Sequence, residues 1–262
     1  MIKAKKSLGQ NFLINQDIIK KITELTDILG KEILEIGPGS GNLTNEILKK
    51  KPKKLYLIEK DDYLSSVLKD KFDEQVTLYN EDILNFDTKS ICNDKLIVFG
   101  NLPYNISTEI LCNWITNLTI KDYWFKELIL MFQKEVADRI IADFNTSAYG
   151  RLAILTNWRL KVKKICDIGP ECFSPRPKVN SSLLHFIPKN NFIMVRNPKN
   201  IEKISRVFFS HRRKMLKKPF NQLFNGDQNI LDKLKIDLNL RPQNLDFDTY
   251  YKLTCEYEKL QS

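Results

Sequence analysis

Four consecutive residues, Asn101-Leu102-Pro103-Tyr104, carry groups that could act together on a planar nitrogen base. The Asn101 side-chain oxygen can accept one hydrogen of an exocyclic amine, and the carbonyl of Leu102 or Pro103 can accept another. Pro103 fixes the turn, and the Tyr104 ring offers a stacking face worth about 1–3 kcal/mol. The set suits an amine held in line with an electrophilic methyl group, where proximity replaces a strong base. A plain turn before a helix starting at Ser107 is the alternative.

A glycine-rich segment, EIGPGSGNLT (35–44), places Gly37, Gly39 and Gly41 directly after an apolar run. Glycines at such a turn let the backbone pass close to a nucleoside ligand. Glu59 follows about 20 residues later, at the end of the next apolar run, where a carboxylate can accept hydrogen bonds from ribose hydroxyls. The glycines alone are also compatible with a tight turn that binds nothing.

The turn distinguishes between two nucleoside cofactors. Its spacing is shorter than the G-x-G-x-x-G turn that binds a pyrophosphate, and Glu35 just before it suits a cation. S-adenosylmethionine carries a sulfonium and an ammonium group and no phosphate, so it is favoured over NAD. Asp82, in YNEDIL, is then expected at the edge of the adenine ring as an acceptor for its amino group; a helix cap or turn residue is the alternative.

Alternating elements must position these residues. Strands are predicted at 32–36, 54–58, 76–79, 96–99 and 127–132, and helices begin near Asn42, Asp62, Ser107 and Gln133. This alternation predicts a doubly wound, Rossmann-like α/β methyltransferase domain over residues 1–190, with a parallel sheet covered by helices on both faces and a further strand at 181–187. Four helical segments without strands then predict a small all-α domain over 191–262.

Charge and composition indicate the partner. The net charge of +10 is concentrated between residues 159 and 220, which contain sixteen Lys and Arg residues but only three Asp and Glu residues. Such a concentration favours a nucleic acid, although solvated lysines that aid solubility are the alternative. Five cysteines without a C-x-x-C pair and only two histidines predict reduced thiols and no metal. No apolar run approaches the ~20 residues of a membrane span, and no secretory signal is visible, so a cytoplasmic location is expected.

Several motifs together resemble one known family, the small-subunit ribosomal RNA adenine dimethyltransferases whose loss gives kasugamycin resistance. The similarity runs in order over about residues 3–217 and is carried by GQNFL (9–13), EIGPGSGNLT (35–44), Glu59, EDIL (81–84), GNLPYNIS (100–107), MFQKEVADRI (131–140), YGRL (149–152), FSPRPKVNSS (173–182) and FSHRRKML (209–216). The resemblance implies methyl transfer from S-adenosylmethionine to N6 of two adjacent adenosines in the 3′-terminal hairpin loop of small-subunit (16S) rRNA, two methyl groups per base. It implies small-subunit rRNA and the immature small subunit as partners, and we expect a monomer.

The resemblance also assigns roles to residues. Cofactor contacts fall on six positions, of which two follow from the resemblance alone, Asn11 and Leu13, and four also follow from the sequence patterns, Gly37, Glu59, Asp82 and Asn101. Phe173 would stack on the flipped base opposite Tyr104, with core packing as the alternative. Phosphate contacts, or simple solvation of that face, are expected for Arg212, Arg213, Lys214, Lys217 and Lys218. Lys60 departs from the family, which more often has an apolar residue there.

Three other functions compete with this one. An antibiotic-resistance methyltransferase acting on large-subunit rRNA shares the fold and an N-x-P-Y motif, but GQNFL and FSHRRKML favour the small subunit. A non-catalytic RNA-binding factor is disfavoured by the intact Glu59, Asp82 and Asn101. An NAD oxidoreductase lacks the expected turn spacing and a catalytic His or Tyr/Lys pair.

Overall fold

The computed structural model describes residues 5, 9–91, 94–118 and 123–261, so Cys92 lies outside the described residues. The chain divides into two compact units, the first made of Met1–Asn113, Lys121–Ala137 and Lys163–Pro188, the second of Trp114–Ile120, Asp138–Val162 and Lys189–Ser262. The boundary expected between domains 1–190 and 191–262 lies close to Pro188, where the chain passes from the first unit to the second. The second unit also contains two segments from within 1–190.

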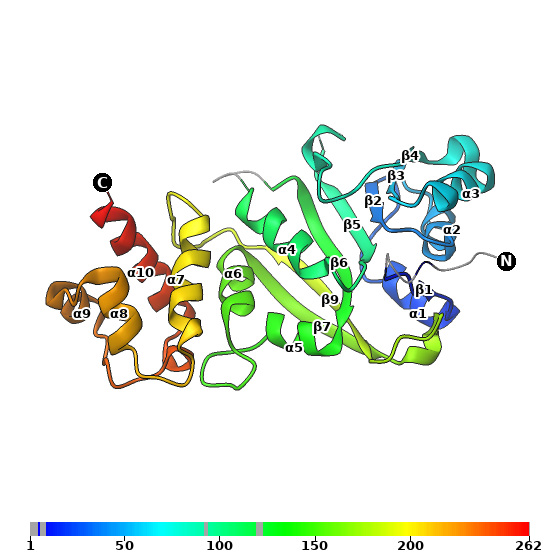
Figure 1. The fold of residues 1–262 in the computed structure, drawn as a ribbon. Coiled ribbons are helices and arrows are strands. Elements are labelled where there is room, and N and C mark those ends of the chain that lie inside the picture. Colours follow the sequence, from blue (N-terminus) through cyan, green and yellow to red (C-terminus); the bar gives the residue numbers. More distant parts are fainter. Residues whose placement is uncertain (1–4, 6–8, 92–93, 119–122, 262) are drawn as a thin grey trace. The chain divides into compact units, whose positions relative to one another are not determined.

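A mixed seven-stranded sheet forms the first unit (Figure 1). Its strand order is β4-β3-β2-β5-β6-β9-β7. The strands are β2 (Glu32–Ile36), β3 (Lys54–Ile58), β4 (Thr77–Tyr79), β5 (Leu96–Asn101), β6 (Phe125–Gln133), β7 (Leu160–Ile168) and β9 (Ser181–Pro188). Strands β2 to β6 are parallel, and all six strands predicted from the sequence are confirmed.

Helices cover this sheet as right-handed connections require. Helix α1 (Gln16–Thr23) and helix α2 (Asn42–Lys49) bury their apolar residues in the same core cluster as one face of the sheet, to which Ile33, Leu57 and Phe99 belong. Helix α3 (Asp62–Phe72) connects β3 to β4, and helix α4 (Ser107–Thr116) starts on the other side of the sheet (Figure 1). The doubly wound arrangement is therefore confirmed.

The sheet is not wholly parallel, which corrects the expectation. Strand β9 runs antiparallel to β6, with Ser181 opposite Gln133. A short ribbon explains its direction, because β8 (Phe173–Ser174) pairs with β1 (Phe12–Leu13) near the carboxyl ends of the parallel strands. The chain is thus already at that edge when β9 begins, and it can only run back across the sheet.

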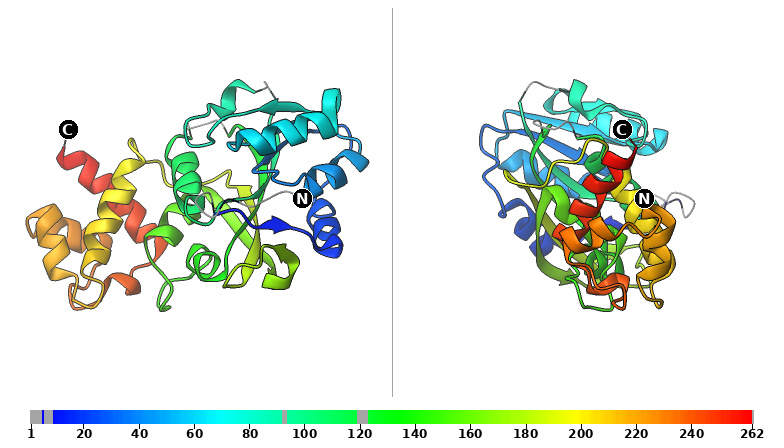
Figure 2. Two further views of the ribbon diagram at one scale, coloured as in Figure 1. Left: turned by 45° about the vertical axis from the view of Figure 1, so that its right-hand side comes forward. Right: turned by 90° about the vertical axis from the view of Figure 1, so that its left-hand side faces the viewer.

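The second unit is mainly helical in the described residues, and it also takes the first residues of β7, 160–162 (Figure 2, where its part after residue 188 runs from yellow to red). It contains α6 (Arg151–Arg159), α7 (Lys199–Ser210), α8 (Lys217–Phe224), α9 (Gln228–Leu234) and α10 (Phe247–Leu260), while α5 (Lys134–Ile140) is divided between the units. Tyr149, Phe208 and Tyr250 form its buried aromatic core, with Phe208 and Tyr250 5.7 Å apart, centroid to centroid. The four helices predicted beyond Pro188 are confirmed. Among the described helices, none has the length and apolar character of a membrane span.

Candidate active site

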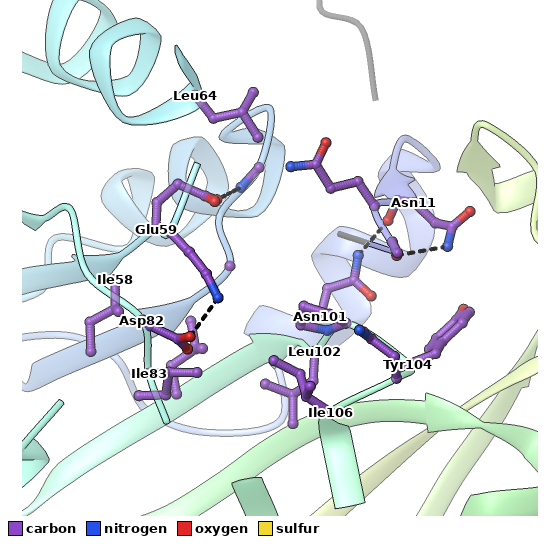
Figure 3. A pocket seen from close by; sticks show the side chains of 18 of the residues that line it. Asn11, Ile58, Glu59, Leu64, Asp82, Ile83, Asn101, Leu102, Tyr104 and Ile106 are labelled. Carbon is purple, nitrogen blue, oxygen red and sulfur yellow. Dashed lines mark hydrogen bonds and ion pairs between the residues drawn. The ribbon is translucent and has the colours of Figure 1, made fainter. Parts of the chain in front are cut away.

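A cavity of about 210 Å³ opens at the carboxyl edge of the parallel strands (Figure 3). Ile36 is in register with both Ile58 and Gly100, so the residues that follow β2, β3 and β5 converge there. The walls come from five separate stretches of the first unit, within 9–12, 36–39, 58–64, 81–84 and 101–106. The sheet therefore brings together the predicted residues Gly37, Glu59, Asp82 and Asn101.

Glu59 organises the glycine turn beside the cavity. Its Oε2 accepts the Gly39 N–H at 3.2 Å, and its Oε1 accepts the Asp61 N–H at 3.0 Å. Gly39 has φ +57°, and a Cβ there would lie 2.6 Å from the Phe12 ring, so only glycine fits. Burial raises the pKa of the Glu59 carboxyl, against hydrogen bonds that lower it. Each carboxylate oxygen keeps a further lone pair, which can accept a ribose hydroxyl.

Asp82 carries an ion pair that the sequence did not predict. Lys60 Nζ lies 2.6 Å from Asp82 Oδ2, and the Leu84 N–H donates to Oδ1 at 3.1 Å. Burial raises the pKa of Asp82, but the hydrogen bonds from Lys60 and Leu84 outweigh it and lower the pKa below its usual value. Asp82 is thus both a turn residue and an anionic acceptor facing the cavity. Lys60, the residue that differs from the family pattern, forms its ion pair with this same carboxylate.

Glu35 is buried beneath the glycine turn, with 2% of its surface exposed. Burial raises the pKa of its carboxyl to about 8; the hydrogen bond from Thr44 lowers it, and the charge of Glu59 raises it. The Thr44 hydroxyl donates to Glu35 Oε2 at 2.7 Å. Glu35 therefore holds its proton at neutral pH, and a cation bound nearby would favour the ionised form.

The amide of Asn101 has a defined orientation. Its Nδ2 donates to the Asn11 carbonyl at 2.7 Å, which leaves Oδ1 as the acceptor, and the described residues make no hydrogen bond to that oxygen (Figure 3). The Pro103 carbonyl accepts the N–H groups of Ile106 and Ser107 at 3.1 and 3.0 Å, because it starts helix α4. Of the two carbonyls considered from sequence, that of Leu102 is the better acceptor for an amine.

The N-terminal segment closes one side of the cavity. Beyond the Asn11 contact, the Gln10 side chain donates to Asp61 Oδ2 at 3.1 Å, and Lys5 Nζ lies 3.0 Å from the same carboxylate. Sequence reasoning gave no warrant for Gln10 or Lys5. The Asp61 side chain also caps α3, so this segment is fastened to the same strand end that carries Glu59.

Two expected contacts lie away from the main cavity. Leu13 is buried, pairs with Phe173 across the β1–β8 ribbon and lines a small pocket beside Glu35. Phe173 is 1% exposed and belongs to the core cluster. The structure does not bring Phe173 to the cavity, so its ring has no free face for a base and core packing describes its position.

The expected phosphate-binding residues belong to the second unit. Arg213 and Lys214 are exposed in the turn between α7 and α8, and Lys217 and Lys218 are exposed at the start of α8. Arg212 is half-buried, and its guanidinium donates to the Ser147 carbonyl and lies over the Phe209 ring. Four of the five cations are thus available to a polyanion, while Arg212 holds the loop around Ser147.

The donor set fits S-adenosylmethionine. Among the described residues, the charged side chains that line the cavity are three carboxylates, Glu59, Glu81 and Asp82, and one cation, Lys60, which is paired with Asp82. Carboxylates are the acceptors that hydroxyls, an amino group and a sulfonium require. A phosphate-bearing cofactor would meet the carboxylates of Glu59 and Asp82 instead. No group of three or more possible metal-binding side chains occurs within the described ranges.

Fold and site together define a class: the mixed seven-stranded sheet with this acceptor-lined edge is that of an S-adenosylmethionine-dependent methyltransferase. A family model described as ribosomal RNA adenine dimethylase matches residues 1–259, and the chain belongs to that family. It is 63% identical over 260 residues to the ribosomal RNA small subunit methyltransferase A of Pelagibacter ubique, with 99% of each chain covered. It is 42% identical to the protein of the same name from Ehrlichia ruminantium, with 94% of each covered.

Solved structures agree with this assignment. A dimethyladenosine transferase from Plasmodium falciparum superimposes with a TM-score of 0.80 at 28% identity, covering 95% of this chain and 98% of that one. The 23S rRNA methyltransferase ErmE superimposes with a TM-score of 0.69 at 19% identity, covering 96% and 100%. The second likeness shows the shared fold alone.

Proposed function

We propose that this chain transfers methyl groups from S-adenosylmethionine to N6 of two adjacent adenosines in the 3′-terminal hairpin loop of small-subunit rRNA. The observation that carries the proposal is the Asn101 amide, whose oxygen is left as an acceptor in the wall of the cavity that Leu102 also lines. The relatives named for the small ribosomal subunit supply the expected target.

The chain's own residues perform the positioning. Asn101 Oδ1 and the Leu102 carbonyl each accept one hydrogen of the adenine amine, which draws the nitrogen towards tetrahedral geometry and makes its lone pair available. The Tyr104 ring, which lines the cavity, stacks on the base. The amine loses its excess proton to solvent once the methyl group is bound to it, so no strong base is needed. Alignment of amine and methyl group then supplies most of the rate.

The cofactor site is proposed from the same cavity. Glu59 would hold the ribose hydroxyls, Asp82 the adenine amino group, and Gly37 and Asn11 the remainder of the cofactor. Leu13, which lines the small pocket beside Glu35 and not this cavity, would lie outside the direct contacts. Glu35, beneath the glycine turn, would lie near the end of S-adenosylmethionine that carries the sulfonium and ammonium groups. When bound, the cofactor would supply an electrophilic methyl group on a sulfonium, with the neutral thioether as the leaving group.

A pre-ribosomal substrate explains the charge distribution. We assign Arg213, Lys214, Lys217 and Lys218 to contacts with rRNA phosphates, which add affinity and salt dependence but little sequence information. With immature small subunits as the partner, the chain works in the cytoplasm, and we expect it to act as a monomer.

The test is methyl transfer to defined particles. Purified protein and radiolabelled S-adenosylmethionine are incubated with small subunits that lack the modification, and separately with large subunits. The expected product is N6,N6-dimethyladenosine at two adjacent positions of small-subunit rRNA. Label confined to the large subunit would favour the resistance-type activity, and cofactor binding without transfer to either particle would favour a non-catalytic factor.

A further inference from the structure

Tyr104 is tied by its hydroxyl to a residue far along the chain. Its Oη lies 2.5 Å from the hydroxyl oxygen of Ser181, 77 positions later. Tyr104 lines the cavity, whereas Ser181 is fully buried at the first position of β9. The bond therefore joins the proposed stacking ring to the sheet itself.

The two ends of this bond differ in rigidity. Ser181 is paired with Gln133 of β6, so the backbone ladder fixes the position of its backbone and Cβ. Tyr104 lies in the turn between β5 and α4, and its ring can rotate about two side-chain bonds. Burial raises the pKa of the Tyr104 hydroxyl, so the phenol stays neutral and able to share a proton with the serine. An anchor at Oη removes the rotational freedom of the ring.

We propose that Ser181 is a positioning residue, which holds the Tyr104 ring in the orientation that stacks on the target adenine. The role rests on the proposed methyl transfer and adds to it, since none of the expected site residues lies on β9. Ser181 itself does not line the cavity, so its effect must pass through Tyr104.

The neighbouring serine provides a matched control. Ser182 is equally buried on the same strand, but successive side chains of a strand point to opposite faces. Its hydroxyl donates to Asp167 at 2.6 Å. Replacing either serine by alanine removes one buried hydroxyl and one hydrogen bond, but only Ser181→Ala releases Tyr104.

The experiment is a double-mutant cycle on methyl transfer. The rates for small subunits lacking the modification are measured for the wild type, Ser181→Ala, Tyr104→Phe, the double variant and Ser182→Ala, together with unfolding stability and the affinity for S-adenosylhomocysteine. Loss of one hydrogen bond predicts that Ser181→Ala and Tyr104→Phe each lower kcat/KM roughly three- to tenfold. The double variant should be no slower than either single variant, because both remove the same bond. Ser182→Ala should keep the wild-type rate, and S-adenosylhomocysteine should bind all five proteins equally.

Two results would overturn the role of Ser181. One is a Ser181→Ala effect of the same size in the Tyr104→Phe background as in the wild type, which would mean that the serine acts independently of the ring. The other is an equal loss of rate in Ser182→Ala, which would reduce the effect to general destabilisation. A wild type that methylates neither subunit would overturn the proposed function, and is recognised before any variant is compared.

Discussion

The proton on Glu35 makes the stability of the cofactor-free protein depend on pH. The carboxyl has its ordinary pKa of 4.5 in the unfolded chain and a pKa of about 8 in the folded one, because burial disfavours the charged form. Below pH 4.5 both states are protonated. Between pH 4.5 and 8 the unfolded chain releases a proton that the folded chain keeps, so the free energy of unfolding falls as the pH rises. One pKa unit corresponds to about 1.4 kcal/mol, which gives a total of roughly 5 kcal/mol as an upper bound.

The variant Glu35→Gln isolates this contribution, since glutamine cannot ionise. Equilibrium unfolding in urea from pH 5 to pH 9, followed by tryptophan fluorescence, gives the stability of both proteins at each pH. We expect the wild type to lose stability relative to Glu35→Gln by several kcal/mol across this range. Thr44→Val, which removes the hydroxyl that donates to Glu35, should move the loss to higher pH. A stability difference between wild type and Glu35→Gln that stays constant with pH would refute the account of this carboxyl.

Three further variants test the site and the proposed rRNA-binding surface. Asn101→Ala removes the side-chain acceptor and should lower single-turnover methyl transfer about 100-fold or more while RNA affinity, measured by filter binding, changes only a few-fold; full activity would contradict the acceptor role. Lys60→Met frees one oxygen of the carboxylate that Lys60 pairs with, and calorimetry should find S-adenosylhomocysteine bound up to about fivefold more tightly; tenfold weaker binding would mean that Lys60 contacts the cofactor itself. Lys217→Ala/Lys218→Ala should weaken binding to small subunits. It should also reduce the slope of log affinity against log salt concentration by about one for each lost phosphate contact. The control Lys20→Ala, which removes another exposed lysine, should change neither the affinity nor the slope.

Much of the site was predictable because parallel strands end at a common edge. Once the apolar runs at 32–36, 54–58 and 96–101 are strands of one sheet, the residues that follow them must meet. Glu59 and Asn101, which follow two of these strands, are therefore predictable as neighbours in one cavity from the sequence alone. Which of Leu102 and Pro103 is the better candidate for the proposed backbone acceptor depends on where α4 starts, because the Pro103 carbonyl already accepts two helix N–H groups.

The remaining features depend on contacts between distant parts of the chain. Ser181 is joined to Tyr104, 77 positions away, and no local pattern marks such a partner. Asn11, whose carbonyl accepts from Asn101 90 positions away, was expected only from the family resemblance. Strand β7 was missed because Lys163 and Lys164 interrupt its alternation of apolar and polar residues. Phe173 shows the converse, since a motif that suggested a base-stacking role belongs to a ring buried in the core.

The most direct test is a crystal structure with S-adenosylhomocysteine and an adenosine-bearing RNA hairpin. The account predicts the adenine N6 within about 3 Å of both Asn101 Oδ1 and the Leu102 carbonyl oxygen, with the base stacked on Tyr104. A complex in which that corner is filled by the protein's own side chains, with the amine directed elsewhere, would contradict it.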